Sequence, residues 1–409
     1  MSEIIENAVC TFCGCLCDDI TVEVDEGRVT GVKRVCANGR GVFLHYDPTP
    51  RPPTVYGKDV GWDEAVAAAA RILKDADSPL IYGLSSMTSE AQRKSVKLAD
   101  RLGAMIDTTS SVCHGPTGLA MQTVGEPTCT LGEVRNRADL IIFWGCNPTV
   151  SHIRHVTRYS VTPRGRLTPN GRRDRTVVVV DVRPTSSTRL ADHFLQVDPG
   201  ADFEVLTALR AVVQGKEDQI TADAVGGIRT AQLQELADLM TACRFGVAFM
   251  GMGLTQTRGR DLTVSELFTL VAELNEHTRF SVIPMRGHGN VTGADQVMTW
   301  QSGYPFAVSF ARGYPVYGPG EFSAVDVLAQ GEADAALILA SDPVAHFPRA
   351  AAQALERIPT IVLDPMPSLT TAVARVVLPT ACSGVDAAGT AYRMDGIPIR
   401  LPPALSPPR

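Results

Sequence analysis

From Trp62 onward the chain alternates amphipathic helical patterns with short, continuous apolar runs. Apolar residues three and four positions apart predict helices over 63–74 and 89–102, and apolar runs predict strands over 79–84 and 105–107. Five further apolar runs end in glycine or a polar residue, which is typical of strands buried on both faces. They cover residues 138–145, 175–181, 245–251, 335–340 and 359–364. Helices that alternate with buried strands predict α/β domains with parallel sheets.

The residues before Trp62 follow a different pattern. Apolar and polar residues alternate over 20–35 on both sides of Glu26-Gly27, which predicts an antiparallel hairpin. Prolines at 48, 50, 52 and 53 then mark a break in the chain. We expect the hairpin to bring Cys36 back beside the cysteines that precede it.

Several of the predicted buried strands end in a small or acidic residue followed by a turn. In open parallel sheets, ligands bind outside the carboxyl ends of the strands, so these turns predict the edge of a binding site. Any one of them alone is equally compatible with ordinary turn chemistry. No G-x-G-x-x-G motif or P-loop is present, so neither a nicotinamide site nor an NTPase is indicated. The candidate cofactor-binding residues are Gly145, Asn147, Pro148, Asp181, Arg183, Gly251, Gly253, Ser341 and Asp342.

Composition narrows the class of protein. The 409 residues are 44% hydrophobic and 20% charged, which suits a globular protein of two or three domains. A net charge of -6 argues against a nucleic-acid surface, and no run reaches the roughly eighteen apolar residues of a membrane span. The first residues, Met-Ser-Glu-Ile-Ile-Glu-Asn, lack the basic and apolar regions of a secretory signal, so we expect a cytoplasmic protein.

Cysteines are concentrated near the start of the chain. Cys10, Cys13 and Cys17 form a C-x2-C-x3-C run, and Cys36 follows the predicted hairpin. Short loops of small residues can turn such thiolates toward one iron–sulfur cluster, which leaves Cys15 as a spare thiol. Four thiolates also suit tetrahedral zinc, and a disulfide framework is a third interpretation, which a cytoplasmic location disfavours.

A second cysteine, Cys113, follows the predicted strand over 105–107 and is next to His114. A thiolate nucleophile with its base is conceivable, but neighbouring side chains point apart on most backbones. A metal-bound thiolate with a nearby acid or base fits better beside a cluster, and a plain buried cysteine is the structural alternative. Arg286 follows another apolar run, and its guanidinium suits two-pronged binding of a small carboxylate.

Over nearly its whole length the chain resembles the B subunit of formylmethanofuran dehydrogenase, which belongs to the molybdopterin-guanine-dinucleotide oxidoreductases and is similar to formate dehydrogenase. The resemblance rests on motifs spread along the sequence. They are C-T-F-C-G-C-L-C-D-D, S-V-C-H-G-P-T, W-G-C-N-P, T-P-R-G-R with R-D-R-T-V-V-V-V-D-V-R, H-F-L-Q-V-D-P-G, P-M-R-G-H-G-N-V-T-G, A-S-D-P-V-A-H-F-P and G-T-A-Y-R-M-D-G.

The resemblance implies a domain organisation. Residues 1–55 would form a [4Fe–4S] domain, to which residues 380–409 could return. Residues 56–115 and 280–379 would form an α/β domain that carries the metal-ligand cysteine, and 116–279 a second α/β domain that binds dinucleotide pterin. Both α/β domains would be doubly wound around parallel sheets. The family's C-terminal β-barrel domain would be absent here and supplied by a separate D subunit.

The resemblance also implies site roles. Cys10, Cys13, Cys17 and Cys36 would hold the [4Fe–4S] cluster, and Cys113 would ligate molybdenum or tungsten carried by two molybdopterin guanine dinucleotides. His114 would handle a proton and Arg286 the carboxylate, while CO2 and formate interconvert. The departures from the family pattern are Gly289 within R-G-H-x-N and the extra thiol of Cys15.

Partners follow from the same resemblance. An A subunit would condense formate with methanofuran, beside C and D subunits and ferredoxin-like electron-transfer subunits. Two other functions remain open: the B subunit of a bacterial formyltransferase/hydrolase complex, which acts on a formylated carrier without redox chemistry, and a non-catalytic scaffold. All seven implied ligand and site positions are present in the sequence, which favours the redox function.

Overall fold

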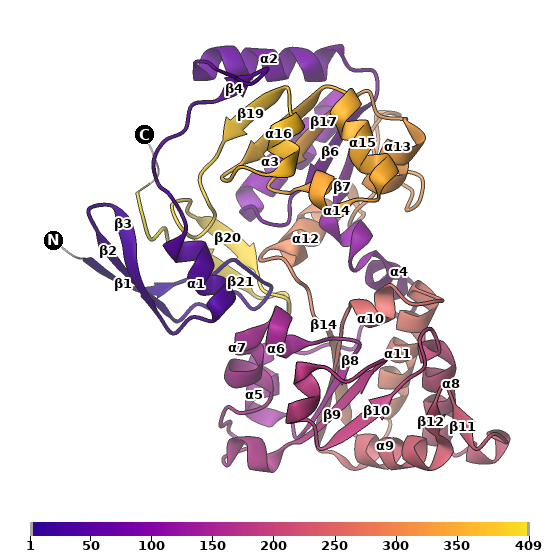
Figure 1. Ribbon diagram of the computed structural model, residues 1–409. Coiled ribbons are helices and arrows are strands. Elements are labelled where there is room, and N and C mark those ends of the chain that lie inside the picture. The colour runs from indigo at the N-terminus through magenta and orange to yellow at the C-terminus, as the bar shows by residue number, and fades with distance from the viewer. Residues whose placement is uncertain (1–2, 407–409) are drawn as a thin grey trace. The chain divides into compact units, whose positions relative to one another are not determined.

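The computed structural model describes residues 3–406, which fold as two compact units (Figure 1). Unit 1 comprises residues up to Val112 together with those from His288 onward, and unit 2 is the continuous segment Cys113–Gly287. The chain therefore crosses between the units twice, after Val112 and after Gly287.

Unit 1 is built on a nine-stranded sheet whose five central strands are parallel; the apolar runs predicted four of them, and β19 (Val376–Pro379) was not predicted. Short antiparallel strands extend both edges, and no sequence pattern predicted these. In spatial order the strands are β16 (Val316–Tyr317), β15 (Val308–Ser309), β7 (Met105–Thr108), β6 (Pro79–Gly83), β17 (Ala335–Leu339), β18 (Thr360–Asp364), β19 (Val376–Pro379), β4 (Thr54–Val55) and β5 (Lys58–Asp59).

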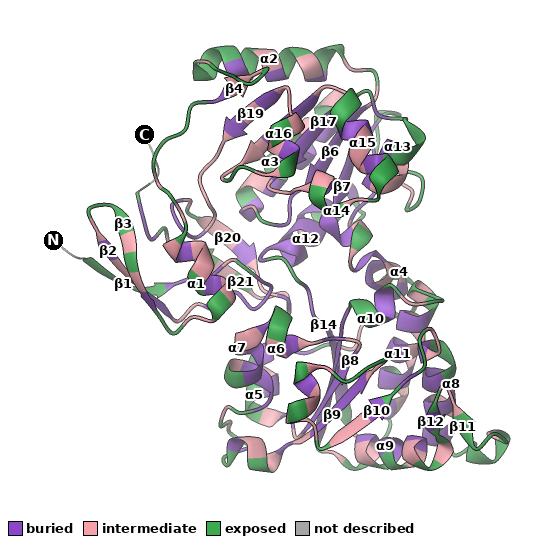
Figure 2. Cartoon of the chain, in the orientation of Figure 1, coloured by how far each residue is buried: buried purple, intermediate pink, exposed green. Residues whose placement is uncertain are grey.

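Helices cover both faces of this sheet, and Figure 2 shows its central strands buried. Residues that alternate along β6 pack in opposite directions: Ile81 faces α2 (Trp62–Asp75), α3 (Ser89–Leu102) and α12 (Val291–Ser302), whereas Leu80 and Tyr82 face α13 (Ala324–Gln330) and α15 (Arg349–Arg357). The helix predicted over 89–102 is confirmed, and Thr88 caps it by accepting a hydrogen bond from the Ala91 amide at 3.4 Å. Smaller helices are η1 (Thr109–Val112), α14 (Pro343–His346) and α16 (Leu369–Val373).

The two ends of the sequence fold together within unit 1. The predicted hairpin is confirmed as β2 (Ile20–Asp25) and β3 (Arg28–Lys33), which join β1 (Glu3–Ala8) in an antiparallel sheet and precede α1 (Ala37–Leu44). The hairpin β20 (Gly389–Tyr392) and β21 (Pro398–Leu401) buries Ala391 and Leu401 against Val9 and Leu16. The Met394 amide also donates a hydrogen bond to the Gly14 carbonyl at 2.9 Å.

Unit 2 contains a five-stranded, wholly parallel sheet. Its order is β10 (His193–Gln196), β9 (Thr176–Asp181), β8 (Leu140–Trp144), β13 (Phe245–Met250) and β14 (Arg279–Pro284). Apolar residues of α4 (Gly115–Val124), α8 (Asp202–Val213), α9 (Thr230–Ala242) and α11 (Asp261–Leu274) pack against one face. The other elements are α5 (Leu131–Arg137), α6 (Pro148–Ser151), α7 (Ile153–His155), α10 (Met252–Thr255), β11 (Ala224–Val225), β12 (Ile228–Arg229) and the short turns η2 (Val156–Ser160), η3 (Gly171–Asp174), η4 (Ser186–Leu190) and η5 (Glu217–Gln219).

The assignment of residues 280–287 to the first α/β domain was wrong in one respect. Strand β14 pairs with β13 along its whole length, so it belongs to the sheet of unit 2. Cys113 and His114 also fall in unit 2, although the sequence-based division assigned them to the first domain. A strand buried on both faces has no polar pattern to reveal which sheet contains it.

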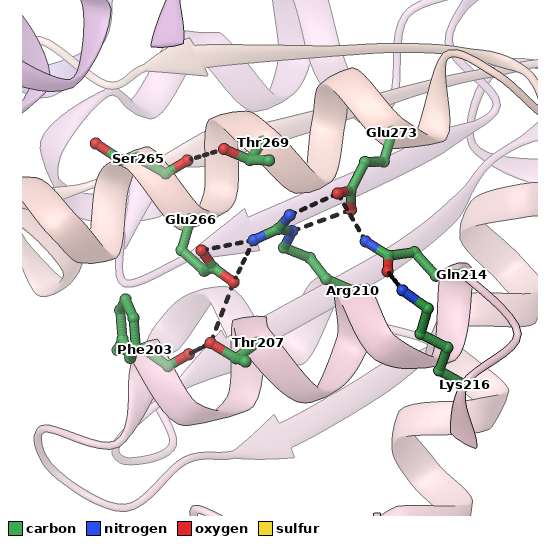
Figure 3. Close-up of polar contacts among 9 residues, drawn as sticks. All are labelled: Phe203, Thr207, Arg210, Gln214, Lys216, Ser265, Glu266, Thr269 and Glu273. Atoms are coloured by element: carbon green, nitrogen blue, oxygen red, sulfur yellow. Dashed lines mark hydrogen bonds and ion pairs between the residues drawn. The ribbon is translucent and has the colours of Figure 1, made fainter. Parts of the chain in front are cut away.

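A polar network braces two helices of unit 2 (Figure 3). Arg210 on α8 donates to both carboxylate oxygens of Glu266 at 2.8 and 2.9 Å, and to those of Glu273 at 2.6 and 3.0 Å. Both glutamates lie on α11, and the Arg210 side chain is 25% exposed. These two-pronged, charge-assisted bonds hold α8 and α11 in one register.

Candidate functional site

The cysteine loop of unit 1 is closed by its own backbone. The Cys10 amide donates to the Cys17 carbonyl at 2.9 Å, and the Leu16 amide donates to the Cys13 carbonyl at 3.1 Å. Cys36 lies at the N-cap of α1, where its sulfur accepts a hydrogen bond from the Gly39 amide at 3.5 Å. The hairpin therefore returns Cys36 toward the loop, as expected from the sequence.

The thiols of this loop are buried beside one another. Burial raises the pKa of Cys10 above its ordinary range, and the nearby Cys13, Cys17 and Cys36 raise it further. A side chain at Gly39 would lie 2.7 Å from the Cys10 sulfur, so α1 packs against the loop without space for a Cβ. Thiols gathered in this way fit a metal–sulfur group, because bound metal takes the place of their protons.

The disulfide and zinc interpretations of this loop can be compared with the structure. Residues 3–406 include all ten cysteines, and each of them is a free thiol there. Within the same residues, no three Cys, His, Asp or Glu side chains converge as ligands of a single metal ion. Four thiolates would share one zinc ion, whereas a [4Fe–4S] cluster takes one thiolate on each iron. Cys15 is only 1% exposed, and its thiol lies within hydrogen-bonding reach of the Cys13 sulfur.

The second candidate site lies in unit 2, where Cys113 precedes α4. The Cys113 carbonyl accepts hydrogen bonds from Thr255 Oγ1 at 2.7 Å and from Gln256 Nε2 at 3.3 Å, both at the end of α10. The side chain is partly exposed. The positive end of the α4 dipole favours an anionic sulfur at this position.

His114 is the N-cap of α4 and is 2% exposed. Its Nδ1 lies 3.0 Å from Thr117 Oγ1, while Nε2 is buried without a hydrogen-bond partner among the described residues. Burial lowers the pKa of His114 to about 3, Arg286 and His152 lower it further, and the Met285 backbone partly opposes this. The imidazole is therefore neutral and has one unsatisfied nitrogen, as expected of a group that faces a bound ligand.

Arg286 follows β14 and is 6% exposed. It is close enough to affect the pKa of His114, so the structure brings the Arg286 segment to the Cys113–His114 segment. Burial also raises the pKa of Glu126 to about 7, and Arg286 opposes this rise. Glu126 was not predicted from the sequence, because nothing in the pattern around it distinguishes it from a solvated carboxylate.

Three of the predicted turns meet at the carboxyl edge of the unit 2 sheet. The Gly253 amide donates to the Gly145 carbonyl at 3.0 Å, and side chains at either glycine would collide with the other. These glycines are needed for close packing of the turns after β8 and β13. Asp181 ends β9, between β8 and β10; burial raises its pKa, while Arg183 is exposed.

The turn after β8 is held by side chains from the turn after β9. Asn147 Oδ1 accepts hydrogen bonds from Ser187 at 2.6 Å, from Thr149 at 2.8 Å and from Ser186 at 3.1 Å. Pro148 follows as the first residue of α6.

Unit 1 repeats this arrangement after β17 and β18. Asp342 Oδ1 accepts from the Thr370 amide at 2.9 Å and from its hydroxyl at 2.6 Å, and Pro343 begins α14. Ser341 precedes Asp342, and each turn enters through a residue with positive φ: 58° at Gly145 and 46° at Ala340. Asn147 and Asp342 therefore occupy equivalent turns in two sheets, each at a carboxyl edge where parallel sheets bind ligands.

Comparisons with known proteins show what this chain is similar to. The family model described as molybdopterin oxidoreductase matches residues 57–409. The B subunit of tungsten-containing formylmethanofuran dehydrogenase 2 from Methanocaldococcus jannaschii is 46% identical over 100% of the chain and 95% of its own length. The protein of the same name from Methanococcus maripaludis is 43% identical over 99% of the chain and 95% of its length.

Two solved structures are also similar. A chain of the formyltransferase/hydrolase complex from Methylorubrum extorquens, crystallised with methylofuran, aligns with a TM-score of 0.69 and 26% identity over 87% of this chain and 94% of that one. Acetylene hydratase from Pelobacter acetylenicus aligns with a TM-score of 0.70 over 98% of this chain and 67% of that one. At 14% identity, the second likeness shows the fold alone.

Among residues 3–406, no helix is both long and apolar enough to cross a membrane. The family match extends over most of the chain, and the two dehydrogenase relatives cover almost all of it. The chain therefore belongs to the molybdopterin oxidoreductase family and, within it, to the B subunits of formylmethanofuran dehydrogenase.

Proposed function

We propose that this chain is the redox subunit of a formylmethanofuran dehydrogenase and interconverts CO2 and formate at a molybdenum or tungsten centre. The observation that carries the proposal is the grouping of Cys113, His114 and Arg286 in unit 2. A partly exposed thiol at a helix N-terminus, a buried imidazole whose Nε2 lacks a partner among residues 3–406 and a buried guanidinium are there together.

The chain's residues fit the cofactors that the family uses. Cys10, Cys13, Cys17 and Cys36 would hold a [4Fe–4S] cluster, and Cys113 would bind the molybdenum or tungsten. The equivalent Asn147 and Asp342 turns would each receive one molybdopterin guanine dinucleotide, which supports a stoichiometry of two. When bound, the metal would exchange an electron pair with the one-carbon substrate and the cluster would carry the electrons onward.

The protein's own groups have separable tasks at such a centre. The planar fork of Arg286 would bind the carboxylate of formate through two hydrogen bonds and compensate its charge. The His114 ring is neutral, and its Nε2 would accept a proton beside the substrate and return it in the reverse direction. The Thr255 and Gln256 bonds to the Cys113 carbonyl would keep the sulfur in a fixed orientation.

The proposal includes partner subunits. Both dehydrogenase relatives are named as subunits, and the structural relative comes from a multi-subunit complex. Among residues 3–406, no sheet closes into a barrel. A D subunit that carries the family's barrel domain is part of the proposal. An A subunit would formylate methanofuran, with a C subunit and ferredoxin-like electron carriers completing the complex.

A second candidate is the redox-free B subunit of a formyltransferase/hydrolase complex, which is favoured by the 26% identity to the Methylorubrum structure over 87% of this chain.

One experiment distinguishes the redox function from this second candidate. The purified complex is analysed for iron, sulfide, molybdenum and tungsten, and formate oxidation with an artificial acceptor is measured beside hydrolysis of the formylated carrier. Bound metal and formate oxidation are expected; hydrolysis without metal or formate oxidation would contradict the redox function and support the second candidate.

Single variants at Cys113, His114 and Arg286 test the three proposed roles separately. Cys113→Ser should change the metal's spectrum and abolish formate turnover, whereas His114→Ala should lower the rate without metal loss. Arg286→Lys keeps the charge but loses the fork, so turnover should fall by roughly tenfold to a thousandfold. Unchanged formate turnover in all three variants would remove this site from the reaction.

A further inference from the structure

A buried histidine outside the proposed catalytic group contacts the substrate-binding arginine. His152 is 2% exposed and follows α6, the short helix that begins after the Asn147 turn. Its Nε2 lies 2.8 Å from the main-chain oxygen of Arg286, 134 residues away in the sequence. A carbonyl oxygen can only accept, so Nε2 carries the proton and donates this hydrogen bond.

The second nitrogen of this imidazole supports the same tautomer. Nδ1 lies 2.8 Å from the hydroxyl of Ser151, which can donate to it. Burial lowers the pKa of His152, and the bond to the Arg286 backbone partly opposes this effect. A neutral ring with Nε2 protonated and Nδ1 accepting satisfies both contacts at once.

The Arg286 peptide is thereby held on both sides. Its amide donates to the Pro284 carbonyl at 3.0 Å, and its own carbonyl receives the His152 proton. The preceding residue, Met285, donates to the Met250 carbonyl of β13 at 2.8 Å. The backbone from which the guanidinium extends is consequently fixed by the sheet at one end and by His152 at the other.

We propose that His152 is a positioning residue that couples the Asn147 turn to Arg286, so that the loop expected to hold one pterin dinucleotide also sets the carboxylate-binding arginine. The inference rests on the proposed function for the role of Arg286. The connection runs through three consecutive steps: Asn147 is held by Ser186 and Ser187, α6 leads from it to His152, and His152 holds the Arg286 carbonyl.

The equivalent turn of unit 1 is built differently. There, Nδ1 of His346 lies 2.8 Å from the Asp342 carbonyl oxygen, which belongs to the same turn. The His346 side chain is exposed. His152 instead reaches across to another strand end. The two turns therefore use their histidines differently, and the one in unit 2 contacts Arg286.

The test compares His152→Leu with His152→Gln in the purified complex. Leucine removes the donor to the Arg286 carbonyl, whereas the glutamine amide can donate to the same oxygen. His152→Leu should raise the KM for formate about tenfold to a hundredfold with little change in kcat, at unchanged metal and pterin content. His152→Gln should recover most of this loss. His277→Leu, the same replacement at an exposed position, serves as the control.

A second readout does not depend on turnover. Amide hydrogen exchange of residues 285–287 should be faster in His152→Leu than in wild type, and close to wild type in His152→Gln. An unchanged KM with unchanged exchange, an equal defect in both variants, or loss of metal from His152→Leu would each overturn the inference. If the wild-type complex shows no formate turnover, the proposed function fails, and hydrogen exchange still decides whether His152 holds the Arg286 segment.

Discussion

The backbone of Gly289 lies directly against the backbone of Thr11 in the cysteine loop. A Cβ at Gly289 would collide with the Thr11 carbonyl group and come 2.7 Å from its carbon atom. The glycine that distinguishes the R-G-H-G-N turn in this sequence therefore allows the turn to pack on the loop between Cys10 and Cys13. The same loop residue is also tied to the far end of the chain, because Thr11 Oγ1 donates to the Ser383 carbonyl at 2.8 Å.

Replacement of Gly289 should consequently disturb the cysteine loop. In Gly289→Ala the collision involves backbone atoms that cannot move aside, so we expect unit 1 to lose about 2 kcal/mol or more of stability and the complex to lose iron. Gly287→Ala is the matched control, because nothing lies within 4 Å of its added Cβ. Denaturant unfolding and iron analysis measure both effects. Equal behaviour of the two variants would contradict this account of the Gly289 contact.

The choice of cluster ligands can be tested with two cysteines. Cys36→Ala should abolish the broad visible absorption and lower the iron content, because a [4Fe–4S] cluster would lose one of its four thiolates. Cys15→Ala should retain the iron, since Cys15 would only donate a hydrogen bond to the Cys13 sulfur. Iron loss as large in Cys15→Ala as in Cys36→Ala would mean that the four ligands were wrongly assigned.

Glu126 predicts a pH dependence of substrate binding. Its pKa is about 7, so the carboxyl group is neutral below that pH and ionised above it. The ionised form would compete with formate for Arg286, and the KM for formate should rise as the pH increases through 7. Glu126→Gln should flatten this rise. The measurement is KM between pH 6 and 8 in both proteins, and an equally steep profile in the variant would exclude Glu126 as its cause.

The raised pKa of Glu126 also predicts that the folded state loses stability as the pH rises. Its pKa is raised from 4.5 in the folded chain, so the folded state binds a proton that the unfolded state has already released. This contribution to stability is complete below about pH 4.5 and is lost as the pH rises toward 7. Wild type should therefore lose stability relative to Glu126→Gln across that interval, as measured by denaturant unfolding at several pH values.

The brace between α8 and α11 should stabilise unit 2. Arg210→Met would leave the carboxylates of Glu266 and Glu273 without their shared cation, and we expect a loss of about 1–3 kcal/mol. The exposed pair of Arg28 and Asp47 is the control, with side chains 60% and 64% exposed. Arg28→Ala should leave the unfolding transition unchanged, because solvent screens such pairs. A transition equally unchanged in Arg210→Met would show that the brace contributes little.

Local sequence patterns were sufficient to predict much of the fold. The helix over 89–102, the hairpin and four of the five central parallel strands of unit 1 follow from spacing, alternation and apolar runs, which depend on neighbouring residues only. The edge strands, such as β15 and β16, contain two residues each and are too short for any pattern. Strand β14 was recognised as a strand but assigned to the wrong sheet, since uniform burial gives no information on its neighbours.

The candidate site was likewise predicted from the sequence only in part. Cysteine spacing and the hairpin predicted that Cys36 would return to the loop, and the glycine and acidic turns predicted the carboxyl edges of the sheets. The roles of Glu126 and His152 come instead from burial and from contacts with Arg286, which is far away in the sequence. A glutamate after a helix and a histidine after a turn have no local signature of such a contact.

The packing of the two ends of the sequence has a consequence for how the protein is made. Thr11 bonds to Ser383, 372 residues later, and Val9 and Leu16 are covered by Ala391 and Leu401. On the ribosome, the cysteine loop therefore emerges long before the residues that enclose it. The loop can reach its final conformation only after residues 383–401 have been synthesised, so assembly of an iron–sulfur cluster there would be a late, post-translational step, and nascent chains that stop before this segment would be unable to retain it.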